Sequence, residues 1–294
     1  MQCTNCAAVL PDENIYCEEC GLRLETEATP ARSVDAREEL VLSAECAGIT
    51  DQGRKRSRNE DRLAIRPAGD GWVLVVCDGV SSSEDSQRAS AIAAEKTAEH
   101  MAYFSAGEAT QGMREAIAES GRAVAQLPKV DPGDEDPAST TIVAALVVGR
   151  RAVIGWLGDS RAYWFGAEGG ARQLTSDHSW MNEVVAAGKM TADEAAHSPT
   201  AHAITKWMGA DGADMEPGVV EFFVEEPGTL LLCTDGLWNY APEAVQIRDV
   251  LKQDGDAVTA ARELVEFALN AGGHDNVTVA ILRLGEWDGE RIQG

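Results

Sequence analysis

Short apolar runs rich in Val, Ile and Leu recur along the chain and predict β-strands. These runs cover residues 72–77, 141–148, 152–157, 161–165, 219–224, 229–233 and 277–283. Ala-rich segments with helical spacing lie between them, at residues 86–104, 108–127, 242–252 and 256–271. Because strands and helices come in runs and do not alternate strictly, the pattern favours an α+β fold, a central β-sandwich flanked by helices.

Composition and charge narrow the range of partners. Of the 294 residues, 44% are hydrophobic, as in an ordinary folded protein, and 25 Lys and Arg against 49 Asp and Glu give a net charge of −24. This field repels a phosphate backbone, so we expect no nucleic-acid partner. No apolar run is long enough to span a bilayer and no signal-peptide pattern opens the chain, so we expect no membrane partner and a cytoplasmic location.

Four of the seven Cys form two CxxC pairs near the N-terminus, Cys3 with Cys6 and Cys17 with Cys20. Two such turns can present four thiolates to one Zn²⁺ in a closed tetrahedral site. Few apolar residues accompany them, so the metal would have to supply the folding free energy. The spacing therefore predicts a zinc-ribbon over residues 1–22 with one structural Zn²⁺. Four unrelated reduced Cys are the alternative.

The chain between this segment and the first strands changes character. Over residues 23–43 it becomes charged and loses its apolar periodicity, which we interpret as an acidic linker. Residues 44–286 carry all the predicted strands and helices and are expected to form one large domain. A short C-terminal tail, residues 287–294, follows.

Three apolar strands end in Asp followed by a small residue: Asp78 in VVCDG, Asp159 in WLGDS and Asp235 in LLCTDG. NED at residues 59–61 and HDN at residues 274–276 add further acids. Each DG taken singly can be an ordinary turn. Carboxylates gathered at a sheet rim, however, repel one another unless cations neutralise them. Oxygen ligands without His or Cys favour Mg²⁺ or Mn²⁺.

The ordered motifs RSRNED, VVCDG, STT, GDSRAY, LTSDHS, LLCTDGLW and GHDNVTV resemble the metal-dependent type 2C (PPM) Ser/Thr protein phosphatases over residues 44–286. The resemblance implies a β-sandwich flanked by helices with a dinuclear metal site at one end. It also implies that a water molecule activated by two Mg²⁺ or Mn²⁺ ions hydrolyses phosphoserine and phosphothreonine on proteins. The implied partners are phosphorylated substrates of Ser/Thr kinases.

The resemblance assigns a role to each residue that matches a family motif. Asp78 would bridge the two ions, the carbonyl group of Gly79 would bind one of them, and Asp235 and Asp275 would bind the other. Asp78, Asp235 and Asp275 are accordingly the candidate catalytic acids.

Four further residues complete the implied site. Glu60 and Asp61 would act mainly through ion-bound water, and Asp159 would bind a weaker third ion that it shares with Asp235. Arg56 matches the Arg that clamps the substrate phosphate, since a planar guanidinium suits two phosphoryl oxygens.

One segment departs from the family pattern, and the role of a second segment stays open. Residues 80–83, Val-Ser-Ser-Ser, stand where many bacterial members have Met-Gly-Gly, so the loop after Asp78 is atypical. Residues 180–211 fall where the family carries a flap beside its active site, and the pattern fits a mobile substrate-selecting element or an ordinary helical hairpin.

A catalytically silent phosphoprotein-binding or scaffold protein of the same fold, recruited to a protein partner through the zinc-ribbon, is the alternative function. Loss of Asp78, Asp235 or Asp275 would favour it, and the sequence retains all three.

Overall fold

The computed structural model describes residues 36–80, 83, 85–104, 108–128, 136–212, 215–251 and 255–286. The predicted zinc-ribbon, most of the predicted linker and the predicted C-terminal tail lie outside these residues. Within the described part, no helix is long and apolar enough to cross a bilayer.

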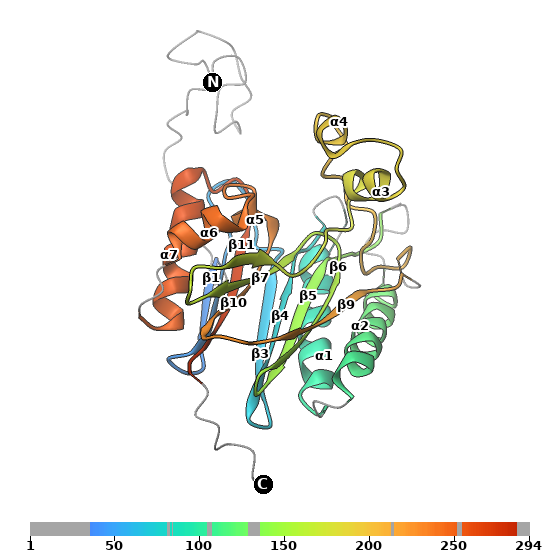
Figure 1. The fold of residues 1–294 in the computed structure, drawn as a ribbon. Helices are drawn as coiled ribbons and strands as arrows, with labels where there is room; N and C mark the ends of the chain where they lie inside the picture. Colours follow the sequence, from blue (N-terminus) through green and yellow to red (C-terminus); the bar gives the residue numbers. More distant parts are fainter. Residues whose placement is uncertain are drawn as a thin grey trace, which may run out of the picture. The chain divides into compact units, whose positions relative to one another are not determined.

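Two antiparallel sheets pack face to face in the described part of the chain (Figure 1). One sheet has six strands in the order β1-β2-β11-β10-β7-β8, and the other has five in the order β3-β4-β5-β6-β9. The strands are β1 (Arg37–Val41), β2 (Cys46–Asp51), β3 (Arg62–Ala68), β4 (Gly71–Cys77), β5 (Ile142–Val148), β6 (Arg151–Leu157), β7 (Arg161–Gly166), β8 (Ala171–Gln173), β9 (Gly218–Phe223), β10 (Gly228–Cys233) and β11 (Val277–Leu284).

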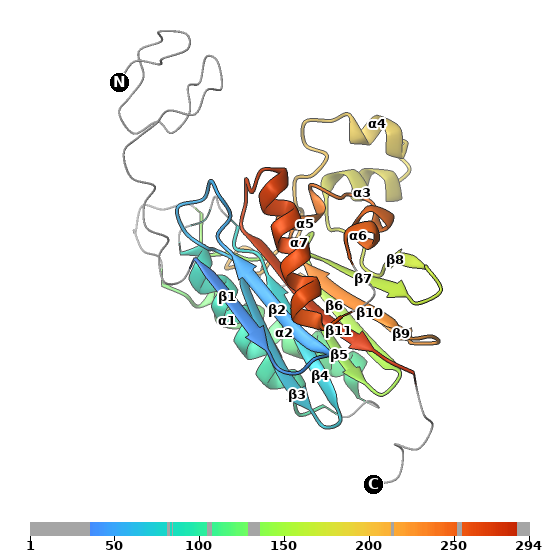
Figure 2. The same ribbon diagram turned by 90° about the vertical axis from the view of Figure 1, so that its left-hand side faces the viewer.

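Helices cover the outer face of each sheet (Figures 1 and 2). The five-stranded sheet carries α1 (Ser86–Met101) and α2 (Ala109–Ala125). The six-stranded sheet carries α5 (Asp235–Trp238), α6 (Ala244–Val250) and α7 (Ala257–Ala271). Two short helices, α3 (Trp180–Ala186) and α4 (Ala192–Ala196), lie between β8 and β9 in the chain. The predicted α+β sandwich flanked by helices is thereby confirmed.

Strand β10 shows how the core is built. Leu230 and Leu232 lie in the apolar layer between the two sheets, whereas Leu231 and Cys233 lie in the layer beneath the outer helices. Successive side chains of a strand point to opposite faces, so a strand covered on both faces needs an unbroken apolar run. This double burial explains why the sequence pattern identified β10 easily.

Strand β1 corrects the predicted domain boundary. Residues 37–41, which we assigned to the acidic linker, form an edge strand, so the folded domain begins before residue 44. Two of its charged residues pair with α7: Arg37 Nη1 lies 2.9 Å from Glu266 Oε1, and Arg262 Nη2 lies 2.7 Å from Glu39 Oε2. An edge strand can carry such charges because one side of it faces solvent.

The apolar side chains between the two sheets should contribute more to the free energy of unfolding than exposed side chains do. Replacing Leu232, which is fully buried there, with Ala should lower the free energy of unfolding by about 2–5 kcal/mol, because transfer and cavity costs add. Leu42→Ala is the matched control, since Leu42 is 43% exposed, and its cost should stay within about 0.5 kcal/mol. Urea unfolding followed by circular dichroism measures both, and equal losses would contradict this account of the core.

Candidate active site

The acids predicted at strand ends come together at one end of the two sheets. Asp78 follows β4, and its carboxyl group interacts electrostatically with those of Asp61, Asp159, Asp235 and Asp275. Asp78 and Asp159 extend from the five-stranded sheet, whereas Asp235 and Asp275 adjoin β10 and β11 of the six-stranded sheet. The site therefore depends on the packing of one sheet against the other.

Burial and mutual repulsion both disfavour ionisation of Asp61, Asp78, Asp159 and Asp235. Removal from water, followed by repulsion from neighbouring carboxylates, raises the pKa of Asp61 to about 8, of Asp159 to about 7 and of Asp235 to about 6. The same two causes raise the pKa of Asp78 well above its ordinary value. Such a cluster offers a large electrostatic gain to a cation.

The donor chemistry fits hard divalent cations. Asp61 Oδ1 and Asp235 Oδ1 are buried and have no hydrogen-bond partner among the described residues. Unpaired buried carboxylate oxygens are costly unless an ion or a donor satisfies them. No group of three or more His, Cys, Asp or Glu side chains in the described residues has a geometry that would hold a metal ion as it stands.

The STT motif shapes the turn that carries Asp78. The carbonyl oxygen of Asp78 accepts hydrogen bonds from Thr140 Oγ1 and from the backbone N–H of Thr141, each at 2.8 Å. Gly79 follows, where a Cβ atom would lie 2.7 Å from the carbonyl oxygen of Glu60. Only glycine allows this approach between the VVCDG and RSRNED motifs.

Asn276 fixes the RSRNED loop, a role that the sequence reasoning missed. It is buried, its Oδ1 accepts from the backbone N–H of Glu60 at 2.8 Å, and its Nδ2 donates to the carbonyl oxygens of Gln52 and Arg58 at 2.8 and 3.0 Å. The Glu60 carboxylate accepts from Ser86 Oγ at 2.7 Å. The sequence signal that could have identified this role is the HDN motif, which places the short polar side chain of Asn276 next to Asp275.

Arg56 lies within the acidic cluster, where it pairs with a carboxylate. Its Nη2 donates to Asp275 Oδ2 at 2.6 Å, and this hydrogen bond raises the pKa of Arg56. Both side chains are about one-third exposed, at 34% and 29%. The residue expected to clamp phosphate thus holds a residue expected to bind an ion.

Arg161 connects three of the sequence motifs. Its guanidinium donates to both carboxylate oxygens of Asp177, at 2.6 Å from Nη2 and 2.9 Å from Nε, and lies 3.7 Å from the ring centre of Trp238. The Trp238 indole in turn donates to the carbonyl oxygen of Asp159 at 3.0 Å. The position of Asp159 is therefore linked to the residues that lead into α3.

Residues 180–211 contain the helical hairpin that the sequence left as one of two alternatives. Ser179 caps α3 by accepting from the backbone N–H of Asn182, and Thr191 and Glu194 form a capping box at α4. The backbone N–H of Gly158, next to Asp159, donates to His178 Nδ1 at 3.2 Å. The base of this hairpin therefore adjoins the acidic cluster.

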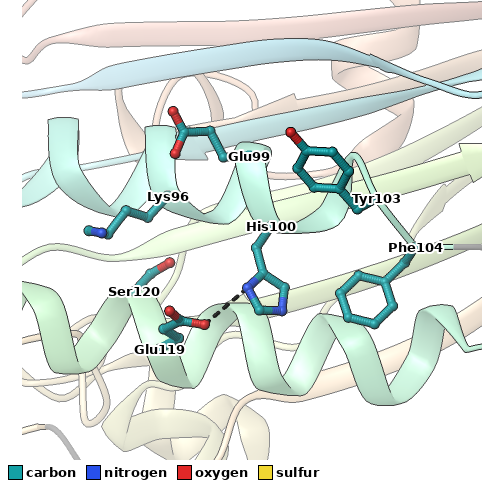
Figure 3. A pocket seen from close by; sticks show the side chains of 7 residues that line it. All are labelled: Lys96, Glu99, His100, Tyr103, Phe104, Glu119 and Ser120. Carbon is teal, nitrogen blue, oxygen red and sulfur yellow. Dashed lines mark ion pairs between the residues drawn. The ribbon is translucent and has the colours of Figure 1, made fainter.

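A separate cavity of about 420 Å³ opens between α1 and α2 (Figure 3). His100 Nδ1 lies 3.0 Å from Glu119 Oε2 there. The Phe104 ring stacks on the His100 ring, with 5.2 Å between the ring centres. Lys96, Glu99, Tyr103 and Ser120 complete its lining. None of the predicted site residues lines it, so this cavity and the acidic cluster are distinct.

Comparison with known proteins agrees with the fold. Residues 50–270 match the model of the family described as protein phosphatase 2C. The chain is 30% identical over 239 residues to the serine/threonine phosphatase stp of Listeria welshimeri, covering 79% of this chain and 93% of that protein. It is 32% identical over 256 residues to protein phosphatase PhpP of Streptococcus pneumoniae, covering 82% of this chain and 98% of that protein.

A solved structure shows the same fold. The serine/threonine phosphatase Stp1 of Staphylococcus aureus superposes with a TM-score of 0.72 at 27% identity, covering 90% of this chain and 100% of that chain. Acids that converge from two packed sheets are suited to hold divalent ions that activate water for hydrolysis. The chain belongs to the protein phosphatase 2C family.

Gly236 tests the close approach between the Asp235 and Asp275 segments. An Ala Cβ at this position would lie 1.8 Å from the carbonyl oxygen of Asn276, so Gly236→Ala must push the two segments apart. We expect a loss of about 1–3 kcal/mol in the free energy of unfolding. Gly285→Ala is the control, because no described atom lies within 4 Å of that Cβ. Unfolding midpoints that fall equally would contradict the assigned contact.

Proposed function

We infer that this chain is a Ser/Thr protein phosphatase of the PPM family that removes phosphate from phosphoserine and phosphothreonine of proteins. The family match and the two bacterial phosphatase relatives support the activity. The observation that carries it is the convergence of Asp78, Asp235 and Asp275 from two sheets. The alternative of a silent scaffold protein lacks support, because all three acids are present and adjacent.

The proposed ion ligands are the acids and one carbonyl group at the end of the sandwich. Asp78 would contact both Mg²⁺ or Mn²⁺ ions, with the Gly79 carbonyl group on one ion and Asp235 and Asp275 on the other. When bound, such ions neutralise the carboxylates and lower the pKa of a water molecule that attacks phosphorus. Unpaired buried carboxylate oxygens among the described residues support this assignment.

Three further acids would act around this pair. We propose that Glu60 and Asp61 hold ion-bound water and that Asp159 joins Asp235 at a weaker third ion. The position of Asp159, within electrostatic reach of Asp235, supports that role.

Arg56 would orient the substrate phosphate. Its guanidinium lies among the acids and pairs with Asp275, so it already compensates part of their charge. Once another cation satisfies Asp275, the planar guanidinium is free to donate to two phosphoryl oxygens. The substrates that this chemistry fits are phosphoproteins produced by Ser/Thr kinases.

The chain outside the described residues completes the proposal. Residues 1–22 would form a zinc-ribbon held by Cys3, Cys6, Cys17 and Cys20 around one structural Zn²⁺, with a linker up to residue 35 and a tail at 287–294. The ribbon would bind a protein partner. The paired CxxC spacing in the sequence supports this assignment.

Activity should depend on added divalent ions and on two side chains. Hydrolysis of a phosphothreonine peptide with Mn²⁺ should stop in excess EDTA.

Asp235→Asn should lower kcat by at least about 100-fold, because removing a metal ligand lowers activity more than removing a residue that only supports a ligand. Arg56→Ala should act chiefly on KM and raise it about 10–100-fold. This is the change expected when substrate binding loses the free energy of one hydrogen bond to a charged group. Arg58→Ala, an exposed Arg in the same loop, is the control. Turnover that survives both EDTA and Asp235→Asn would defeat the proposal.

The ribbon makes a separate prediction about zinc content. Mass spectrometry of the purified full-length chain should find one zinc per chain, and the double variant Cys3→Ser, Cys17→Ser should lose it, because each substitution removes a thiolate. Cys46→Ala, which alters a buried Cys in β2, should keep its zinc. Unchanged zinc in the double variant would refute the ribbon without affecting the phosphatase assignment.

A further inference from the structure

A directed line of hydrogen bonds ends on Asp61. Asn59 Nδ2 donates to Thr50 Oγ1 at 2.8 Å, Thr50 Oγ1 lies 2.7 Å from Thr278 Oγ1, and Thr278 Oγ1 donates to Asp61 Oδ2 at 2.7 Å. The orientation of Asn59 is set independently, because its Oδ1 accepts from the backbone N–H of Asp61 at 3.2 Å. Since the single proton of Thr278 is used on Asp61, the Thr50 hydroxyl donates to Thr278.

Thr234, which directly follows β10 and precedes α5, donates to the same carboxylate oxygen. Its Oγ1 accepts from the backbone N–H of Thr278 at 3.0 Å and donates to Asp61 Oδ2 at 2.9 Å. Two hydroxyl groups therefore donate to Oδ2 of Asp61. Oδ1 is buried and has no partner among the described residues.

These threonines occupy positions where the sandwich would otherwise be apolar. Strand alternation places Thr50 in line with Cys46, and Thr278 in line with Ala280, both in the layer between the sheets. Thr234 and Thr278 are 0% exposed, and Thr50 and Asp61 are 1% exposed. Burying hydroxyl groups so deeply is costly unless each is paired, and here each accepts one hydrogen bond and donates another.

We propose that Thr234 and Thr278 are positioning residues that hold Asp61 with Oδ2 fixed by hydroxyl groups and Oδ1 left available to a divalent ion or its water. The inference rests on the proposed function and names groups beyond the ion ligands. Hydrogen bonds that reach a carboxylate favour its ionised form and fix its orientation, and such supporting groups strengthen metal binding. Thr50 and Asn59 extend the same support outward.

Isosteric substitution separates the hydroxyl group from the shape of the side chain. Thr278→Val keeps the shape and loses the donor, so the dissociation constant for Mn²⁺ on metal-depleted full-length protein should rise about 10–100-fold by calorimetry. Thr278→Ser keeps the donor and should stay within about 3-fold of the parent protein, well short of that loss. Thr229→Val, in a buried position near the start of β10, is the matched control and should leave Mn²⁺ affinity unchanged.

A double-variant comparison shows whether the threonines act through Asp61. In an Asp61→Asn background, Thr278→Val should cause little further loss of Mn²⁺ affinity, because the carboxylate it positions is already gone. Thr234→Val should repeat both results and provides the test if Thr278→Val fails to fold, as judged by its unfolding midpoint. An equal loss of affinity with and without Asp61 would overturn the proposal.

Failure of this inference can be told apart from failure of the proposed function. If the parent protein binds no Mn²⁺, the dinuclear centre itself is wrong. If the parent protein binds Mn²⁺ and both folded Thr→Val variants bind it equally well, the centre stands and the positioning role is wrong.

Discussion

Repulsion among carboxylates at one end of the sandwich is the constraint that shapes the surrounding structure. Hydroxyl groups donate to Asp61, the Asn239 amide donates to Asp235 at 3.1 Å, and the Arg56 guanidinium pairs with Asp275. The hydrogen bonds to Asp61 and Asp235 favour the charged form of these two acids, yet the pKa of Asp61 stays raised to about 8 because burial outweighs its two hydrogen bonds. Such unfavourable burial of neighbouring carboxyl groups is typical of sites that bind a cation.

The same constraint ties the core to the site. Asp78 and Asp235 are carried by strands of different sheets, so their separation is set by the apolar layer that contains Leu74 and Leu232. Close packing transmits small shifts, because interiors have few voids to absorb them. Substitutions in that layer would therefore alter the site.

The sequence predicted most of the strands that are covered on both faces, although it missed the fully buried β2 and found the partly exposed β9. β4, β5, β10 and β11 are covered on both faces and read as continuous apolar runs, so they were found. β1 carries Arg and Glu on an exposed edge, and β3 includes two Arg and Pro67, which hide the strand pattern. Strand-end acids could be predicted locally, but Thr278 could not, because its role depends on the register that pairs it with Thr50 on β2.

The pairing of Arg56 with Asp275 suggests an order of events. A guanidinium held at 2.6 Å by a carboxylate has fewer donors left for a phosphate, and the same carboxylate has fewer lone pairs left for an ion. Under the proposed assignment, Asp275 would hold a divalent ion in place of the guanidinium, and Arg56 would then donate to the substrate phosphate. Because one cation would replace another on Asp275, no carboxylate would be left unpaired, and ion binding before substrate binding is the order that the electrostatics would favour.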